Sequence, residues 1–118
     1  MPIYKAPFRD QQLVMHELLG AVYMLRPLSR YADLDADTLN QVIEEAGKFC
    51  EELLLPVNQS GDAEGCTYDV ASRSVKTPRG FKEAYEAFCA AGWPGLAGET
   101  EYGGQGLPHL LQIAFYEM

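Results

Sequence analysis

Three glycines just ahead of a proline form the pattern with the most recognisable chemistry: Gly103, Gly104 and Gly106 precede Pro108. Apolar residues follow from Leu110 and predict a helix that begins with Pro108. Exposed backbone amides at a helix N-terminus attract anions, so this pattern would suit a phosphate-binding loop. A dinucleotide-binding fingerprint needs a strand before its glycines, and none is predicted here. The phosphate-loop hypothesis therefore has only weak support.

Two carboxylates and a histidine beside these glycines are the candidate acid–base groups. Glu99 and Glu101 lie in the loop, where they need burial or a charged partner before their pKa values become useful for catalysis. Solvated acids are the favoured interpretation. His109 lies in the first helical turn and would be near a ligand held by the glycines, but a surface histidine is favoured. The motifs of serine hydrolases, P-loop proteins and zinc proteases are absent, and we assign no catalytic residue.

The cysteines indicate neither a disulfide framework nor a metal site. Cys50, Cys66 and Cys89 are odd in number and widely spaced, and His16 and His109 are the only histidines. We therefore predict no metal ligand. Cys50 and Cys89 occupy apolar positions of predicted helices, which favours buried structural thiols.

The overall charge excludes some classes of partner. Nine basic and seventeen acidic side chains give a formal net charge of −8, which disfavours nucleic acid. The densest basic group is interpreted as a solvated loop face, because acidic residues flank it; its members are Arg73, Lys76, Arg79 and Lys82. No apolar run approaches the eighteen residues of a membrane helix, and charges interrupt the first twenty residues. These features predict a cytoplasmic protein.

The first third of the chain predicts an arm and a short helix. Two prolines within residues 1–8 disfavour helix and suggest an extended arm. Asp10 is a candidate N-cap for a short helix that ends at Gly20. Residues 21–31 fit either a continued helix or a short strand before Pro27.

The strongest periodicity lies between residues 39 and 54. Its apolar residues recur in steps of three and four with acidic residues on the other face, which predicts an amphipathic core helix. Asp35 or Asp37 can cap this helix, and Thr38 with Gln41 has the spacing of a capping box. The helix is therefore expected to start near residue 37.

The segment after this helix predicts a hairpin and another helix. Pro56 is expected to end or kink the core helix. Residues 61–80 are polar, contain two β-prone pieces and predict a small surface hairpin. Residues 81–89 form an amphipathic pattern that Gly92 caps. Its apolar face carries the aromatic stripe Phe81, Tyr85 and Phe88. The pattern predicts a single all-α, antiparallel, bundle-like unit with a small polar hairpin or loop insertion.

Several motifs resemble one enzyme family. The matching stretches are Gly92-Trp93-Pro94-Gly95-Leu96, Glu101-Tyr102-Gly103-Gly104-Gln105-Gly106-Leu107-Pro108, Tyr4-Lys5-Ala6-Pro7, Arg9-Asp10, His16-Glu17, residues 56–62 and residues 65–69. Together they resemble the N-terminal helical domain of acyl-CoA dehydrogenases, in the branch related to methylthiopropionyl-CoA dehydrogenase. Relatives often have a proline before the Glu-Tyr-Gly-Gly run, whereas this chain reads Gly98-Glu99-Thr100, which suggests a more flexible loop.

The resemblance implies a division of the chain and a place for its site residues. Residues 1–30 would be an N-terminal extension arm and short helix, and residues 31–118 a truncated N-terminal helical domain. In the full-length enzyme, three domains enclose FAD and carry out α,β-dehydrogenation of acyl-CoA thioesters in fatty acid metabolism. The catalytic base and main flavin contacts lie elsewhere in that enzyme, so no cofactor is expected on this chain. The residues expected near the substrate pocket are Tyr102, Gly103, Gly104 and His109.

Three hypotheses follow for function. In the first, the chain is a fragment without turnover, whose partners are the remaining dehydrogenase domains, with acyl-CoA bound by the full-length enzyme. Exposed apolar surface on the helix that reaches Met118 then predicts self-association. In the second, the chain is a free-standing acidic helical protein-interaction module that uses the aromatic stripe or the glycine loop. In the third, the chain itself binds FAD or acyl-CoA.

Overall fold

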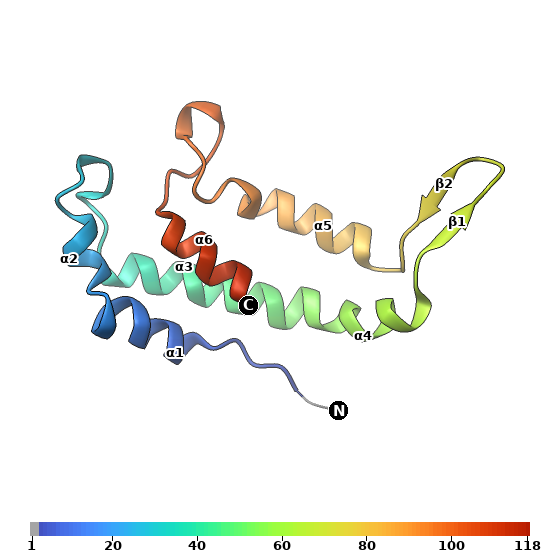
Figure 1. The fold of residues 1–118 in the computed structure, drawn as a ribbon, viewed down its shortest axis with the longest axis horizontal. Coiled ribbons are helices and arrows are strands. Elements are labelled where there is room, and N and C mark those ends of the chain that lie inside the picture. The colour runs from blue at the N-terminus through green and yellow to red at the C-terminus, as the bar shows by residue number, and fades with distance from the viewer. Residues whose placement is uncertain (1–2) are drawn as a thin grey trace.

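The N-terminal arm runs into a helical rod that ends at a glycine (Figure 1). The computed structural model describes residues 3–118, so the first two residues of the predicted arm lie outside the described part. Helix α1, Phe8–Gln12, continues through a π-helical turn, Leu13–Leu18. Asp10 lies inside α1, so its prediction as N-cap is wrong; Pro7 precedes the helix instead. Gly20 ends the rod with a left-handed φ of 57°, as the stop signal predicted.

The segment that the sequence left open between helix and strand is helical. Helix α2, Ala21–Leu25, is followed by a 3₁₀ turn at Ser29–Tyr31. Arg30 in this turn pairs with Glu99, with 2.5 Å between Nη1 and Oε1. The ion pair ties the first part of the chain to the glycine loop.

The central helix is longer than the sequence predicted. Helix α3, Ala36–Phe49, begins one residue before the expected start, because Asp35 accepts a 2.8 Å hydrogen bond from the Thr38 amide. Thr38 is thus the third helical residue, and its prediction as the first residue of a capping box is wrong.

Pro56 neither ends nor breaks the long helical segment that begins with α3. A π-helical segment, Cys50–Leu54, leads directly into helix α4, Leu55–Glu64, with Pro56 in its first turn. A proline lacks the amide hydrogen that a regular helix would use there, and the wider π turn just before it absorbs the altered bonding. Gly65 ends α4 with a φ of 67°.

A hairpin and a returning helix follow. Strands β1, Thr67–Asp69, and β2, Ser74–Lys76, pair antiparallel with Tyr68 opposite Val75, which confirms the predicted hairpin. Helix α5, Phe81–Ala90, then runs back beside α4 (Figure 1). Gly92 closes it with a φ of 80°, as predicted.

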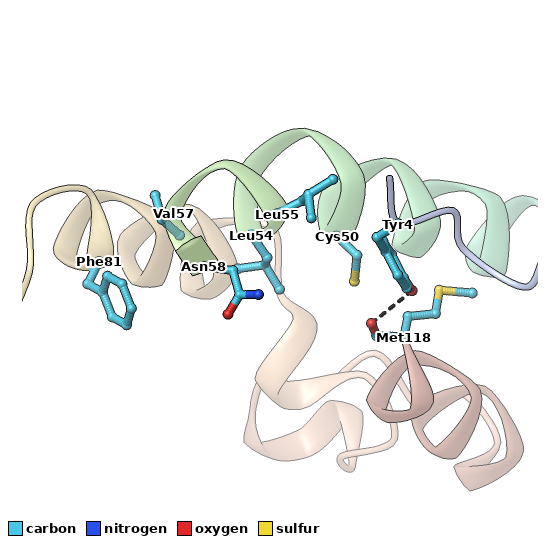
Figure 2. Close-up of a pocket in the computed structure, with 8 residues that line it drawn as sticks. All are labelled: Tyr4, Cys50, Leu54, Leu55, Val57, Asn58, Phe81 and Met118. Carbon is cyan, nitrogen blue, oxygen red and sulfur yellow. Dashed lines mark hydrogen bonds between the residues drawn. The ribbon is translucent and has the colours of Figure 1, made fainter. Parts of the chain in front are cut away.

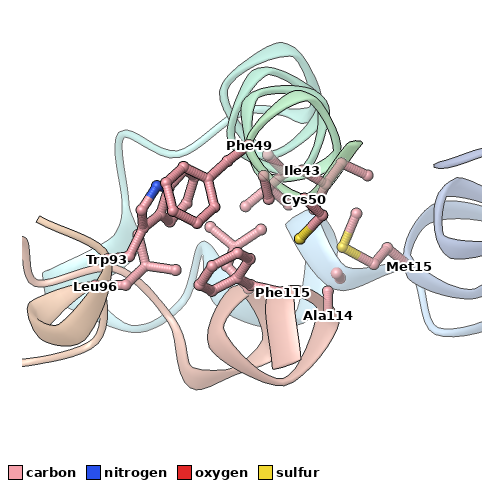
Figure 3. Close-up of a cluster of buried hydrophobic side chains, with 12 residues drawn as sticks. Met15, Ile43, Phe49, Cys50, Trp93, Leu96, Ala114 and Phe115 are labelled. Carbon is pink, nitrogen blue, oxygen red and sulfur yellow. The ribbon is translucent and has the colours of Figure 1, made fainter. Parts of the chain in front are cut away.

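Helix α6, His109–Glu117, packs against α3 and completes the core (Figure 3). Pro108 caps α6, so the helix starts one residue later than expected. Trp93 and Phe115 stack with ring centroids 4.5 Å apart, and Phe49 lies 6.1 Å from Trp93. The mostly helical, antiparallel fold class predicted from the sequence is confirmed.

Part of the predicted apolar face is not buried. Leu53 and Leu54 are 43% and 38% exposed, and Tyr85 is 66% exposed. Cys50 is buried as predicted, but Cys89 is exposed, so its assignment as a buried thiol is wrong. The reason is geometric. Helices α4 and α5 extend beyond the core, and no other helix or strand of residues 3–118 runs over them there (Figure 1).

The molecule is flat. Its principal extents are 57 × 39 × 17 Å, and its radius of gyration is 17.4 Å. A compact domain of this length has a radius of gyration of about 13.5 Å. The accessible surface is 8221 Å², against about 6,400 Å² for a compact monomer of this size. A large share of the surface is therefore uncovered for a chain of this length.

Candidate functional site

The backbone amides of the glycine loop donate hydrogen bonds within the loop itself. Four consecutive amides, those of Gly104, Gln105, Gly106 and Leu107, donate to loop carbonyls at 2.8–3.0 Å. The Gln105 side chain also donates to the Gly92 carbonyl at 3.1 Å. An anion-binding loop needs amides that point at the ligand. These four are already used, so this loop does not fit the pyrophosphate of a dinucleotide or of coenzyme A.

The glycines are needed because two backbone segments cross in close contact. A Cβ atom built on Gly104 would lie 2.3 Å from the carbonyl carbon and oxygen of Gly98. A Cβ atom on Gly95 or Gly98 would lie 3.4 Å from the Gly104 Cα atom. Trp93 is 8% exposed and Leu96 2% exposed, and both enter the core from the same loop. The loop is therefore an ordered crossing anchored on the core, and a phosphate cradle is not supported.

The four residues expected near the substrate pocket lie in and just after this crossing. Tyr102 is 83% exposed at the end of a 3₁₀ turn, Thr100–Tyr102. Gly103 follows with a φ of 86°, and Gly104 packs against Gly98. His109 is exposed in the first turn of α6. The structure thus brings Tyr102, Gly103 and Gly104 together in one turn.

Both acidic residues of the loop, Glu99 and Glu101, lie on the protein surface. Glu99 is 61% exposed at its side chain and pairs with Arg30, and Glu101 is exposed. Catalytic carboxylates usually owe their shifted pKa values to burial or to closely placed charges. An exposed ion pair fits a structural tie between the loop and the turn after α2.

A hollow that could hold a ligand lies on another part of the molecule (Figure 2). It has a volume of about 420 Å³, within the range of about 300–1,000 Å³ that is typical of ligand sites. The arm, the α3–α4 rod, the start of α5 and the end of α6 form its walls. The lining residues are Tyr4, Cys50, Leu54, Leu55, Val57, Asn58, Phe81 and Met118.

This cleft suits an apolar group and offers little for catalysis. The Tyr4 hydroxyl donates to the Met118 carbonyl at 2.8 Å (Figure 2). Burial, with a smaller contribution from Glu51, raises the pKa of the Cys50 thiol, so the thiol stays protonated and weakly nucleophilic at neutral pH. Most of the remaining lining is aliphatic or aromatic. The cleft can hold an acyl chain or an apolar side chain.

The arm is held against the rod at the edge of this cleft. The Ala6 amide donates to Glu51 Oε1 at 2.8 Å, and Lys5 pairs with Glu51 at 3.3 Å. These contacts, led by the Ala6 amide, lower the pKa of the Glu51 carboxyl. A Cβ atom on Gly47 would lie 2.9 Å from the Ala6 Cβ atom, so this glycine lets the arm approach closely.

The cleft was not predicted from the sequence. It depends on contacts between residues more than forty positions apart, and on a rod that continues through Pro56. One signal was present in the sequence: the apolar stripe runs on through Leu53 and Leu54 to Val57, which favours a longer helix.

Residues 3–118 contain neither a metal-binding cluster nor a membrane-spanning helix. No cluster of three or more histidine, cysteine, aspartate or glutamate side chains there is placed to hold a metal ion. Within the same range, no helix combines the length and the apolar character that crossing a membrane requires.

Comparison with known proteins finds relatives along the whole chain. A 3-methylmercaptopropionyl-CoA dehydrogenase of Ruegeria pomeroyi is 34% identical over 115 residues, which is 98% of this chain and 19% of that protein. A broad-specificity linear acyl-CoA dehydrogenase of Mycobacterium tuberculosis is 27% identical over 117 residues, which is 99% of this chain and again 19% of that protein. No family model matches the chain. The chain spans about a fifth of the length of these relatives, and the resemblance to acyl-CoA dehydrogenases is confirmed.

Proposed function

We propose, from the similarity of the whole chain to part of two acyl-CoA dehydrogenases, that it is the N-terminal helical part of a flavin-dependent acyl-CoA dehydrogenase. The observation that carries this proposal is the 34% identity, which extends over 98% of the chain. The mostly helical fold supports it as well. The enzyme would remove hydrogen from the α and β carbons of an acyl-CoA thioester, in fatty acid metabolism and in the cytoplasm.

The chain's own contribution is proposed to be structural. Residues 1–30 are proposed to be an extension arm and short helix that brace the helical domain of residues 31–118. The arm's bonds to Glu51 and to the Met118 carbonyl support this role. Tyr102, Gly103, Gly104 and His109 would lie near the substrate pocket of the complete enzyme. FAD and the catalytic base would be held by the remaining domains, which are the proposed partners of this chain.

Self-association is part of the proposal. The accessible surface of 8221 Å² exceeds that of a compact monomer by about 1,800 Å². A standard protein–protein interface buries about 800 Å² on each partner. Much of the excess carries apolar side chains, such as Leu18 at 75%, Ile113 at 68% and Val75 at 63% exposure. Surface of this size and character favours association.

Anaerobic titration tests the enzyme assignment. The native polypeptide that contains this chain is purified, its flavin spectrum is recorded, and acyl-CoA thioesters of different chain length are added. The proposal expects bound flavin whose long-wavelength absorption bleaches on addition of an acyl-CoA. A native polypeptide without flavin would contradict it and would favour the protein-interaction module instead. The 118-residue chain, assayed beside it, is expected to show no turnover.

A further inference from the structure

The β-hairpin presents an apolar face that no other part of residues 3–118 covers. Tyr68 lies directly opposite Val75, so both side chains are on one face of the two strands. They are 59% and 63% exposed, and Val70 in the connecting turn is 77% exposed. A lone two-stranded hairpin is at best marginally stable in water. Packing of its apolar face on another surface would therefore stabilise the hairpin.

The hairpin also differs in charge from the rest of the chain. Residues 64–82 contain four bases, Arg73, Lys76, Arg79 and Lys82, and two acids, Glu64 and Asp69, which gives a formal charge of +2. The chain total is −8, so the other 99 residues carry −10. Opposite charges on two surfaces of one molecule favour association between copies.

A groove of matching character lies between the α1 rod and α6. Its apolar walls are Val14, Met15, Leu110, Ile113 and Ala114, and its polar residues are Asp10, Gln11 and Glu117. Its volume of about 150 Å³ is below the range of small-molecule sites. The groove is therefore the right size for a protruding side chain.

One atom of this groove lacks a partner. Gln11 is 5% exposed, and its Nε2 donates to the Ala114 carbonyl at 2.8 Å and to Glu117 at 3.2 Å. Its buried Oε1 accepts no hydrogen bond from any residue within 3–118. Unpaired buried acceptors are costly. Because Oε1 is itself buried, a docking side chain reaches it only after the Gln11 side chain moves.

The hairpin cannot reach the groove of its own chain. It projects at one end of the longest axis, whereas α1 and α6 lie toward the other end (Figure 1). We propose that the hairpin of one copy docks by its Tyr68 and Val75 face into the groove of a second copy, with its basic residues beside Asp10 and Glu117. This proposal rests on the self-association proposed above and names its two surfaces.

Sedimentation velocity of the 118-residue chain over a concentration series tests the contact. The double variant Tyr68→Ser/Val75→Ser alters the hairpin, and Ile113→Ser alters the groove. Both change exposed side chains, and circular dichroism checks that helix content is retained. Each variant is expected to weaken association at least tenfold. Tyr23→Ser, at an 86% exposed residue of α2, is the matched control and is expected to leave association unchanged.

Mixing the variants gives the sharpest result. The hairpin variant keeps an intact groove and the groove variant an intact hairpin. An equimolar mixture is therefore expected to associate more strongly than either variant alone. Association that survives both sets of changes, or that Tyr23→Ser weakens equally, overturns the docking contact and leaves self-association standing. A monomeric wild-type chain overturns both and leaves the enzyme assignment untouched.

Discussion

Gly104→Ala is the substitution that most directly tests the structure of the glycine loop. The new Cβ atom would lie 2.3 Å from the carbonyl carbon and oxygen of Gly98, about 1 Å closer than ordinary van der Waals contact. Because both contacts are with backbone, no side chain can rotate away. One of the two crossing segments has to move.

The expected cost follows from what that movement disturbs. The Gly104 amide donates to Glu99 at 2.9 Å and the Gly106 amide to Gly98 at 2.8 Å. Weakening both costs about 2 kcal/mol, and forcing an extra carbon into a packed site costs about 1–3 kcal/mol. The total is about 4 kcal/mol. For a chain of this length that lowers Tm by about 15 °C.

Gly103→Ala is the matched control. Gly103 has a φ of 86°, but no atom lies within 4 Å of the position that its Cβ atom would take. Only the left-handed conformation is penalised, by about 1–2 kcal/mol. Thermal unfolding followed by circular dichroism measures both variants, and amide exchange at residues 104–107 reports whether the loop opens. A Gly104→Ala variant as stable as Gly103→Ala would refute the close crossing of the two segments.

Three further predictions concern the core, a helix cap and the arm. Trp93→Ala should lower the free energy of unfolding by about 3–5 kcal/mol because the ring is buried against Phe115. Tyr85→Ala, at a 66% exposed ring, should change this free energy little. Equal effects of the two variants in denaturant titrations would contradict the core assignment. The Thr38 amide lowers the pKa of Asp35 below its usual 3.8. The stability that the cap contributes is therefore present above pH 3.8 and is lost as the pH falls through the lower folded pKa. The difference in free energy of unfolding between the wild type and Asp35→Ala should shrink on acidification, and a difference independent of pH would count against the cap. The pKa of Glu51 is likewise lowered from 4.5, chiefly by the Ala6 amide. Hydrogen-exchange protection of Ala6 should therefore fall in Glu51→Gln and on acidification of the wild type. Unchanged protection would argue against the bond between the arm and Glu51.

Much of the fold could be predicted because local signals agree with the tertiary structure. The stripe from Leu39 to Cys50 fits a helix buried on one face, and Gly20 and Gly92 end helices with the left-handed geometry that glycine permits. Pro56 misled the prediction because a π turn absorbs the lost hydrogen bond, and a local pattern does not reveal that wider turn.

The candidate site was harder to predict. The glycines looked like a phosphate loop, since glycine permits both exposed amides and close backbone crossings, and only the partners of the amides distinguish the two. The cleft joins Tyr4, Phe81 and Met118, which are far apart in the sequence. No spacing rule brings such residues together.

The mass of the native polypeptide tests the central claim most directly. Antibodies against this chain would isolate that polypeptide for intact mass spectrometry. Since the chain corresponds to 19% of each relative, a dehydrogenase that contains it should be about five times longer. A mass of that order with bound flavin is the predicted result. A native polypeptide of 118 residues that folds without flavin would contradict the dehydrogenase assignment.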